Sequence, residues 1–307
     1  AGSEVVRSRD AAVLEHLDIV VDVGGIYDTS KLRFDHHQRG FFETVDGEPG
    51  KATCPQEATG RWRTKLSASG LVYKHFGREV IAQLLGTNAE QTKLIWEEVY
   101  ERLLEAVDGV DNGVEISDGP PRYKDQSDLA SRVHRLNPRW NEASNDDDQN
   151  RRFEQASSLC GSEFLDVLGE IAEAWLPARE KVKDSLEGRN KVHPSGQLLM
   201  LESGGLPWKE HLYALEREVG IAGHVKFVLY TDQAGMWRVQ AVTAEGSLFT
   251  NRLSLPEPWC GVRDEALVSI SGIPGCTFVH ANGFIGGNST YEGALAMAAK
   301  TLEAVAA

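Results

Sequence analysis

The pattern of apolar and polar positions in the first half of the chain predicts one buried strand and two helices. Residues 18–25 hold a run of β-branched residues ended by two glycines, which is typical of a strand buried on both faces of a parallel sheet. Residues 67–76 predict a helix opened by a serine. A longer helix is predicted over residues 88–107, where apolar residues recur every four positions and Asn88 is followed three residues later by a glutamine, as in a helix cap. We expect it to end in the turn-forming cluster at residues 108–113.

In the second half of the chain, the predicted secondary structure changes near residue 188 from helix to mainly strands. The Asn- and Asp-rich run at residues 145–150 predicts a solvated loop, and residues 151–186 resume a helical pattern. After Gly188 we expect three strands, the last two joined by a turn, and a closing helix, at residues 197–202, 225–230, 237–243 and 290–305. The sequence therefore predicts an α/β domain over residues 1–187 and a smaller α+β domain over residues 188–307.

Composition and charge limit the functions open to such a chain. Its 307 residues carry 32 Lys and Arg against 46 Asp and Glu, a net charge of −14, and are 41% hydrophobic. This is the profile of an ordinary globular protein long enough for two domains, and no apolar run is long enough to span a membrane. The acidity argues against a broad basic surface for nucleic acid. It leaves room for an enzyme that acts on phosphates through bound metal, because a cation site is built from acids.

The cysteines and the beginning of the chain add little. Cys54, Cys160, Cys260 and Cys276 are widely scattered, so neither a zinc knuckle nor a disulfide framework is predicted, and a reduced intracellular compartment is the default. The chain begins Ala1-Gly2-Ser3 without an initiator methionine. We therefore expect upstream sequence, and any targeting peptide within it, to be missing.

Asp22 is the first candidate for chemistry. It stands within Val-Val-Asp-Val, where burying a carboxylate would cost several kcal/mol unless a cation or a hydrogen-bond donor meets it (roughly 2–7 kcal/mol for an unpaired polar group, and more for a charge). A strand-end Asp that caps a turn is the structural alternative. We favour a metal ligand, because open α/β sheets place their sites at the C-terminal edge of parallel strands.

The second candidate is the triplet Asp35-His36-His37. In an extended segment neighbouring side chains point to opposite faces, so we expect only one of the two histidines to ligate a given ion. The other would contact phosphate or donate a proton, with Asp35 orienting an imidazole by accepting its second N–H. Histidines with satisfied structural hydrogen bonds are the alternative.

The third candidate is the pair Asp108 and Asp111 at the end of the long predicted helix. A helix end followed by Asp-Asn-Gly is often only a turn. Together with Asp22 and the triplet, the pair offers a further hard oxygen ligand of the kind that Mn²⁺ or Mg²⁺ takes. The sequence does not decide between these two aspartates.

Four motifs resemble the Myg exonuclease family of the DHH phosphoesterase superfamily. They read F-D-H-H-Q-R-G around the triplet, W-R-T-K-L-S-A-S-G-L-V-Y-K-H-F-G at residues 62–77, V-D-G-V-D-N-G at 107–113 and F-V-H-A-N-G-F-I-G-G-N at 278–288. The likeness runs in order from about residue 5 to 305. It implies a parallel-sheet DHH-type phosphoesterase domain followed by a DHH-associated α+β substrate-binding domain. It further implies 3′→5′ exonuclease action on single-stranded RNA with two divalent ions, Mn²⁺ or Mg²⁺.

The resemblance also implies roles for the candidates. Asp22 matches the acid shared by both ions, Asp35-His36-His37 the signature triplet, and Asp108 or Asp111 the last acidic motif. The family begins with a strand-turn motif of the type His-Asn-Gly-x-Phe-His-x-Asp-Glu, which this chain does not show. If that motif is truly missing, we expect weak metal binding and little activity. The family further implies an intracellular, mitochondrial or nuclear protein, and leaves a homodimer open.

Substrate-side candidates come from both predicted domains. In the first, a polar helix start downstream of the triplet could hold the scissile phosphate. In the second, a glycine-rich segment before the last helix, with Ser289 and Glu292 spaced as a capping box, resembles a phosphate-binding turn; the alternative is an ordinary turn. The candidates are Arg39, Lys65, Ser67, Ser69, Arg252, His280, Gly283, Gly286 and Gly287.

The sequence thus predicts a metal-dependent phosphodiesterase that hydrolyses RNA from one end. Two other functions stay open. The same metal core could serve a small-substrate phosphohydrolase acting on pyrophosphate or on short or cyclic nucleotides. A non-catalytic binding protein is the other alternative, because part of the expected metal site is not seen in this chain.

Overall fold

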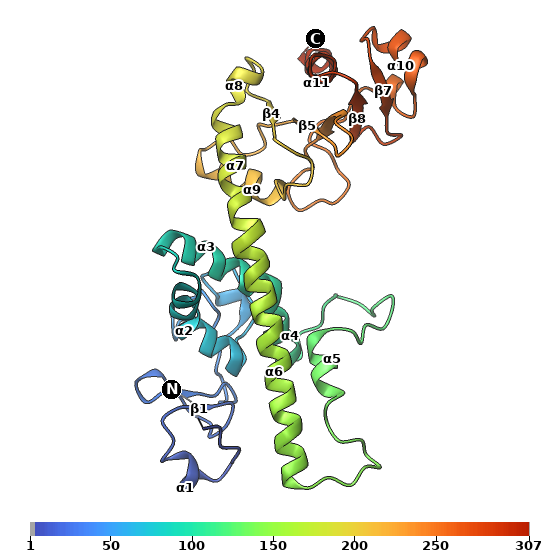
Figure 1. The fold of residues 1–307 in the computed structure, drawn as a ribbon. Coiled ribbons are helices and arrows are strands. Elements are labelled where there is room, and N and C mark those ends of the chain that lie inside the picture. Colours follow the sequence, from blue (N-terminus) through green and yellow to red (C-terminus); the bar gives the residue numbers. More distant parts are fainter. Residues whose placement is uncertain (1–3, 307) are drawn as a thin grey trace. The chain divides into compact units, whose positions relative to one another are not determined.

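The computed structural model describes residues 4–306, which form a mixed α/β protein (Figure 1). Ala1–Ser3, on which the expectation of missing upstream sequence rests, lie outside the described residues. The chain divides into two compact units, residues 1–173 and 174–307. No described helix is both long and apolar enough to cross a bilayer.

The first unit contains a small mixed sheet, against which α2 packs, and several further helices. Its strands are β1 (Val20–Val21), β2 (Tyr27–Asp28) and β3 (Arg33–Phe34), in the order β1-β3-β2. Its α-helices are α1 (Ala11–Leu14), α2 (Ala68–Leu85), α3 (Ala89–Val99), α4 (Glu105–Asp111), α5 (Leu129–His134) and α6 (Asp146–Glu170). Only β1 and β3 are parallel, since β2 runs antiparallel to β3.

The strand predicted over residues 18–25 is therefore much shorter than expected. It pairs over two residues, and Asp22 ends it with a φ of 65°. Ile19 and Val21 are about half exposed, so the prediction of a strand buried on both faces is wrong. A run of β-branched residues favours an extended backbone, but it does not decide what covers each face.

The starts of the two helices predicted at residues 67–76 and 88–107 are correct, and their ends are not. Ser67 caps α2, and Asn88 forms a capping box with Gln91 at α3. The second helix continues through a π-helical turn, Tyr100–Leu104, into α4, so Asp108 lies inside a helix and not in the predicted turn. A side-chain cap is a local signal that the sequence carries, whereas tertiary packing sets how far a helix extends.

The predicted loop at residues 145–150 is the first turn of α6. Asn145 caps this helix by accepting a hydrogen bond from the Asp148 amide, and Asp146, Asp147 and Asp148 occupy the first turn. Negative charge is favourable there because it complements the partial positive charge of a helix N-terminus. The run of acids is therefore a helix-start signal.

The second unit is built on one five-stranded sheet. Its strands are β4 (Leu198–Met200), β5 (Phe227–Thr231), β6 (Trp237–Ala241), β7 (Cys276–Val279) and β8 (Ile285–Asn288), in the order β4-β5-β6-β8-β7. Its helices are α7 (Leu176–Glu187), α8 (Arg189–Val192), α9 (Lys209–Glu218), α10 (Asp264–Ser271) and α11 (Tyr291–Ala306). The three strands and the closing helix predicted here are confirmed to within a few residues.

Residues alternate between the two faces of this sheet. On β5, Phe227 and Leu229 enter a core formed with α10 and α11, whereas Val228 and Tyr230 enter a core formed with α7 and α9. Helix α7 thus belongs to the packing of the second unit. The two units divide within the π-helical turn Ile171–Trp175 before α7, whereas the predicted boundary near residue 188 lies at its end.

Candidate metal and phosphate site

Asp35 fixes the loop that follows β3. Its carboxylate accepts hydrogen bonds from the Gly25 amide (2.7 Å) and the His37 amide (3.0 Å), and its Oδ1 lies 2.6 Å from His37 Nδ1. Burial alone would raise the pKa of Asp35, but these hydrogen bonds hold it below its ordinary value. Asp35 therefore stays ionised and sets the orientation of His37.

The two histidines lie on the same side of the chain. Their ring centroids are 4.2 Å apart, and one ring nitrogen from each lies within 4.8 Å of the other and of an Asp22 oxygen. This corrects the expectation that His36 and His37 point to opposite faces. The reason is local: the Asp35 side chain bonds to the backbone two residues on, and this Asx turn takes the triplet out of the extended conformation.

His36 is the buried centre of the site. Its side chain is 4% exposed, and neither ring nitrogen has a hydrogen-bond partner among the described residues. Its Nε2 nevertheless lies 3.0 Å from Asp111 Oδ2 and 3.7 Å from Asp22 Oδ1, without hydrogen-bond geometry. A buried, unsatisfied ring nitrogen that faces two carboxylates is the donor set that a divalent cation takes, so these residues fit a metal ion.

Asp22 reaches the site in a different setting from the one predicted. Its side chain is 60% exposed, so the expectation of a carboxylate buried inside a strand is wrong. Partial desolvation and the nearby Asp111 carboxylate nonetheless raise its pKa above the ordinary value. A cation between the two acids would relieve that repulsion.

The structure gives Asp108 and Asp111 different surroundings. Asp108 is fully buried and accepts hydrogen bonds from the Ser67 amide (2.9 Å), the Ser67 hydroxyl (2.6 Å) and the Tyr100 hydroxyl (2.9 Å). Burial raises the pKa of Asp108 to about 6. Asp111, one turn further along α4, is 46% exposed and faces His36 and Asp22. Of these two acids, Asp111 therefore presents an oxygen at the candidate metal site and Asp108 does not.

The N-terminus of α2 lies beside these acids. The Ser67 hydroxyl caps the helix and lies 2.8 Å from the Ser69 hydroxyl, which is exposed. A helix start presents unpaired N–H groups and partial positive charge, and both favour a phosphate. The arrangement can therefore receive an anion next to a cation.

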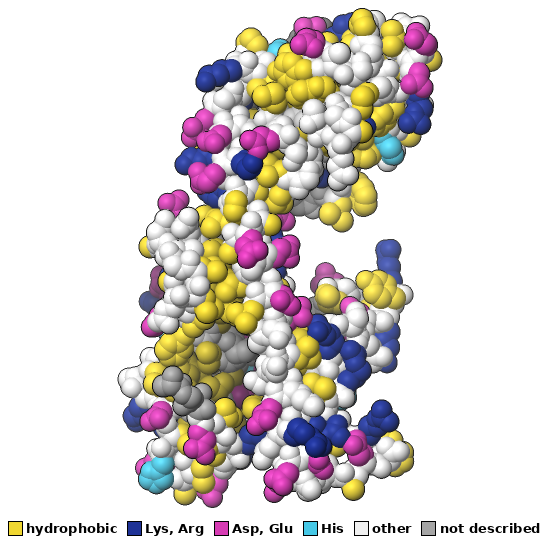
Figure 2. Space-filling view, viewed as in Figure 1, with side chains coloured by type: hydrophobic (Ala, Val, Ile, Leu, Met, Phe, Trp, Pro, Cys, Tyr) yellow, Lys and Arg dark blue, Asp and Glu magenta, His cyan; other side chains and the backbone are white. Residues whose placement is uncertain are grey.

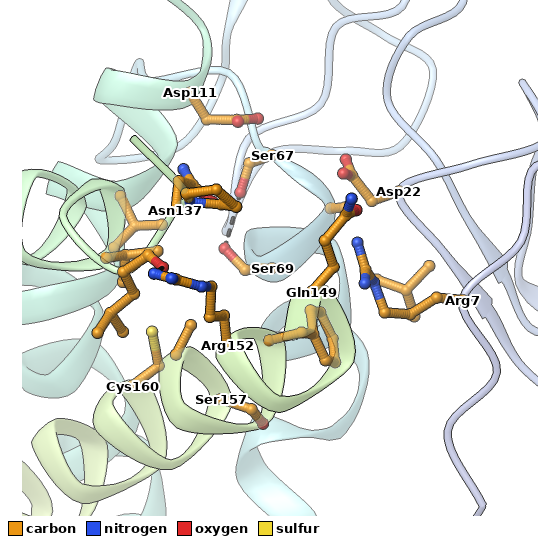
Figure 3. A pocket seen from close by; sticks show the side chains of 18 residues that line it. Arg7, Asp22, Ser67, Ser69, Asp111, Asn137, Gln149, Arg152, Ser157 and Cys160 are labelled. Atoms are coloured by element: carbon orange, nitrogen blue, oxygen red, sulfur yellow. Dashed lines mark hydrogen bonds between the residues drawn. The ribbon is translucent and has the colours of Figure 1, made fainter. Parts of the chain in front are cut away.

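Asp22, Asp111, Ser67 and Ser69 border a cavity of about 760 Å³ in the first unit (Figure 3). In Figure 3 they approach from one side, and side chains of α6 approach from the other. The sequence reading missed this second wall, although its residues recur at helical spacing: Gln149, Arg152, Phe153, Ala156 and Cys160. That spacing was the available signal, but it does not tell which apolar face of a helix lines a cavity.

Two other predicted phosphate ligands of the first unit do not line the cavity. Arg39 is exposed on the loop after the triplet. Lys65 is half-buried, with its Nζ 5.7 Å from the centre of the Phe41 ring. Their phosphate contacts stay predictions.

The predicted phosphate ligands of the second unit already have contacts within the fold. Arg252 is 8% exposed and its Nη1 lies 2.7 Å from a Glu216 oxygen, so its charge is already paired. His280 is exposed and packs on the Phe284 ring, and Gly283 occupies a turn with a φ of 64°. Figure 1 shows β8 within the sheet of this unit.

Gly286 and Gly287 are in β8, hydrogen-bonded between β6 and β7, and not in a turn at a helix start. The expected free N–H groups are therefore absent at these two described positions. The expected capping box is also not formed, since the Thr290 hydroxyl, and not Ser289, accepts from the Gly293 amide.

Comparison with known proteins identifies the family. Residues 1–302 match the model of the exonuclease family described as "Uncharacterised protein family (UPF0160)". The chain belongs to this MYG1 family. It is 51% identical over 304 residues to the MYG1 exonuclease of Bos taurus, covering 98% of this chain and 77% of the bovine protein. The MYG1 exonuclease of Homo sapiens is 50% identical (98% and 78%), and the MYG1 protein of Dictyostelium discoideum 48% (98% and 88%). No solved structure matches the chain.

Proposed function

We propose that this MYG1 family member is a divalent-metal-dependent phosphodiesterase that removes nucleotides from the 3′ end of single-stranded RNA by two-metal hydrolysis. The names of its bovine and human relatives support a nuclease-type function. The observation that carries the metal dependence is the buried His36 ring, whose unsatisfied Nε2 faces Asp22 and Asp111. The resemblance of the motifs to DHH phosphoesterases supports RNA, the 3′→5′ direction and a second ion.

Each side chain has a role in this proposal. Asp22, His36 and Asp111 would hold Mn²⁺ or Mg²⁺, which supplies positive charge to the phosphate and to an attacking water. Ser69 and the N-terminal amides of α2 bind a phosphate oxygen. His37, held through Nδ1 by the ionised Asp35, is placed to donate a proton to the leaving oxygen.

The decisive experiment replaces one ligand and keeps its size. We expect Asp111→Asn to weaken Mn²⁺ binding by at least about tenfold, because an amide oxygen lacks the negative charge of a carboxylate, and to slow hydrolysis of a 5′-labelled RNA. Asp166→Asn is the matched control, since Asp166 is exposed on α6 and does not line the cavity. Calorimetry gives the Mn²⁺ affinity and a gel of the RNA ladder gives the rate.

The same assay separates the other functions. Turnover of pyrophosphate or dinucleotides that far exceeds shortening of RNA would favour a small-substrate phosphohydrolase, which the same metal core also suits. RNA binding without cleavage in Mn²⁺ would favour a non-catalytic binding protein. Equal Mn²⁺ affinity in the wild type and Asp111→Asn would contradict the ligand set.

A further inference from the structure

The far wall of the cavity has a different chemistry from the acidic end. It is formed by α5, the segment after it and one face of α6. Its apolar members are Val133, Leu136, Pro138, Phe153 and Ala156. None of these side chains can bind a metal or a phosphate, so this wall does not extend the cation site.

Polar groups interrupt the apolar wall at a few points. The side chains of Asn137 and Gln149 line the cavity; both residues are exposed, and within residues 4–306 neither side-chain amide makes a hydrogen bond. Arg152 donates to the Leu136 carbonyl at 3.0 Å and pairs with Glu142, and its buried Nε has no partner within the same range. An apolar surface interrupted by a few polar groups is typical of a small-molecule site.

A second cation lies at the rim. The Arg7 guanidinium carbon is 5.3 Å from the centre of the Phe153 ring, and its Nη1 donates to Asn150 at 3.0 Å. Figure 3 shows Arg7 and Gln149 near Asp22, while Arg152 and Asn137 lie further along the cavity. The cavity therefore has an acidic end suited to a cation and phosphate, which Arg7 and Gln149 adjoin, and an apolar end bordered by Asn137 and Arg152.

We propose that the apolar end is a subsite for the nucleoside of the terminal nucleotide. The base packs on the apolar wall, the Asn137 and Gln149 amides hydrogen-bond to its polar edge, and its phosphate lies at the start of α2. The volume of about 760 Å³ is within the range of sites for molecules of this size. This inference rests on the proposed function, because that function supplies the phosphate position.

The test measures product binding and needs no turnover. With Mn²⁺ present, we expect adenosine 5′-monophosphate to bind at least about tenfold more tightly than ribose 5-phosphate, as one stacked base accounts for. Ala156→Trp, which fills the apolar end, should abolish this preference. Ser158→Trp, on the exposed part of the same helix and outside the lining, should keep it.

A milder pair guards against misfolding of the Trp variant. Gln149 and Gln155 are both exposed on α6, but only Gln149 lines the cavity. Gln149→Ala should weaken adenosine 5′-monophosphate binding about fivefold through one lost hydrogen bond, whereas Gln155→Ala should leave it unchanged. Equal binding by these two variants, or no preference of the wild type for the nucleotide over the sugar phosphate, would overturn the subsite. Absence of RNA cleavage with intact nucleotide binding would overturn the proposed function alone.

Discussion

At the residue scale, Asp108 connects the start of α2 to the helix that carries Asp111. Its carboxylate accepts hydrogen bonds from Ser67 and Tyr100, and it packs closely against Gly70, where a Cβ would lie 2.3 Å from Asp108 Oδ1. The Asp108 carboxylate therefore joins α4 to the start of α2 and does not face the candidate metal site. Its role differs from that of Asp111, although the two stand three residues apart.

The raised pKa of Asp108 makes stability depend on pH. Its pKa is about 6 in the folded protein against an ordinary 3.8, so between these values the folded chain binds more protons than the unfolded chain. The stabilising contribution is full below pH 4 and is lost as pH rises to about 6, in total about 3 kcal/mol. We expect Asp108→Asn to remove this part of the pH dependence. Hydrogen exchange of α2–α4 amides in urea, at steps from pH 4 to 7, measures it.

A matched variant checks the assignment. Asp118→Asn changes an exposed aspartate of the same unit and should keep the pH profile of the wild type. Identical profiles for Asp108→Asn and the wild type would show that Asp108 has an ordinary pKa in the folded protein.

The sequence predicted which candidate residues lie close together better than it predicted the burial and orientation of each. The triplet and Asp22 do come together, as predicted, because motifs carry chemistry in residue type and order. The prediction that the two rings face opposite sides was wrong. A single hydrogen bond, donated by the His37 amide to the Asp35 carboxylate in an Asx turn, decides their orientation. The choice between Asp108 and Asp111 also required the fold, because helical phase and tertiary partners separate two acids that are equivalent in sequence.

At the element scale, helix caps could be predicted from the sequence, whereas the extent and the pairing of the elements could not. Ser67 and Asn88 start helices where expected, because a capping side chain acts on its own neighbours. Whether the acids at residues 146–148 lie in a loop or a helix start depends on the rest of the 25-residue helix that they begin, to which they add only a favourable end charge. The glycines before α11 were likewise ambiguous in the sequence, since they suit either a turn or a strand. Pairing with β6 on one side and β7 on the other places Gly286 and Gly287 in β8.

The close packing of β8 predicts that adding a Cβ at Gly286 destabilises the second unit. A Cβ there would lie 2.8 Å from Met297 Cε, 3.0 Å from Leu255 Cδ1 and 3.2 Å from the Phe278 carbonyl. We expect Gly286→Ala to lower the free energy of unfolding of the second unit by about 1–3 kcal/mol through overpacking. Gly205→Ala is the control, because a Cβ at Gly205 meets nothing within 4 Å. Hydrogen exchange of the β6 and β8 amides in urea reports on both, and unchanged protection in Gly286→Ala would contradict the close packing.

At the scale of the whole molecule, the charge of −14 restricts how the proposed RNA substrate could be bound. Several cations of the described chain are already paired, such as Arg252 with Glu216 and Arg179 with Glu218. Figure 2 shows Lys and Arg mixed with Asp and Glu over most of the visible face, with one local group of Lys and Arg over α5 and the first part of α6. We therefore expect the proposed site to bind phosphate mainly at the N-terminus of α2 and through a bound metal ion, and not through a broad basic surface.

Salt dependence measures how many phosphates are held by cationic side chains. If about two are neutralised, log K should fall with log[salt] with a slope of about −1.4 for a single strand, and affinity should drop about sevenfold between 50 and 200 mM salt. Fluorescence anisotropy of a short labelled RNA, with Ca²⁺ replacing Mn²⁺ to limit hydrolysis, gives the slope. A loss of about a thousandfold would instead require about seven phosphate contacts and would contradict binding of phosphate at a few local groups. Because Arg7 borders the cavity and Arg39 does not, Arg7→Gln should reduce the slope more than Arg39→Gln does.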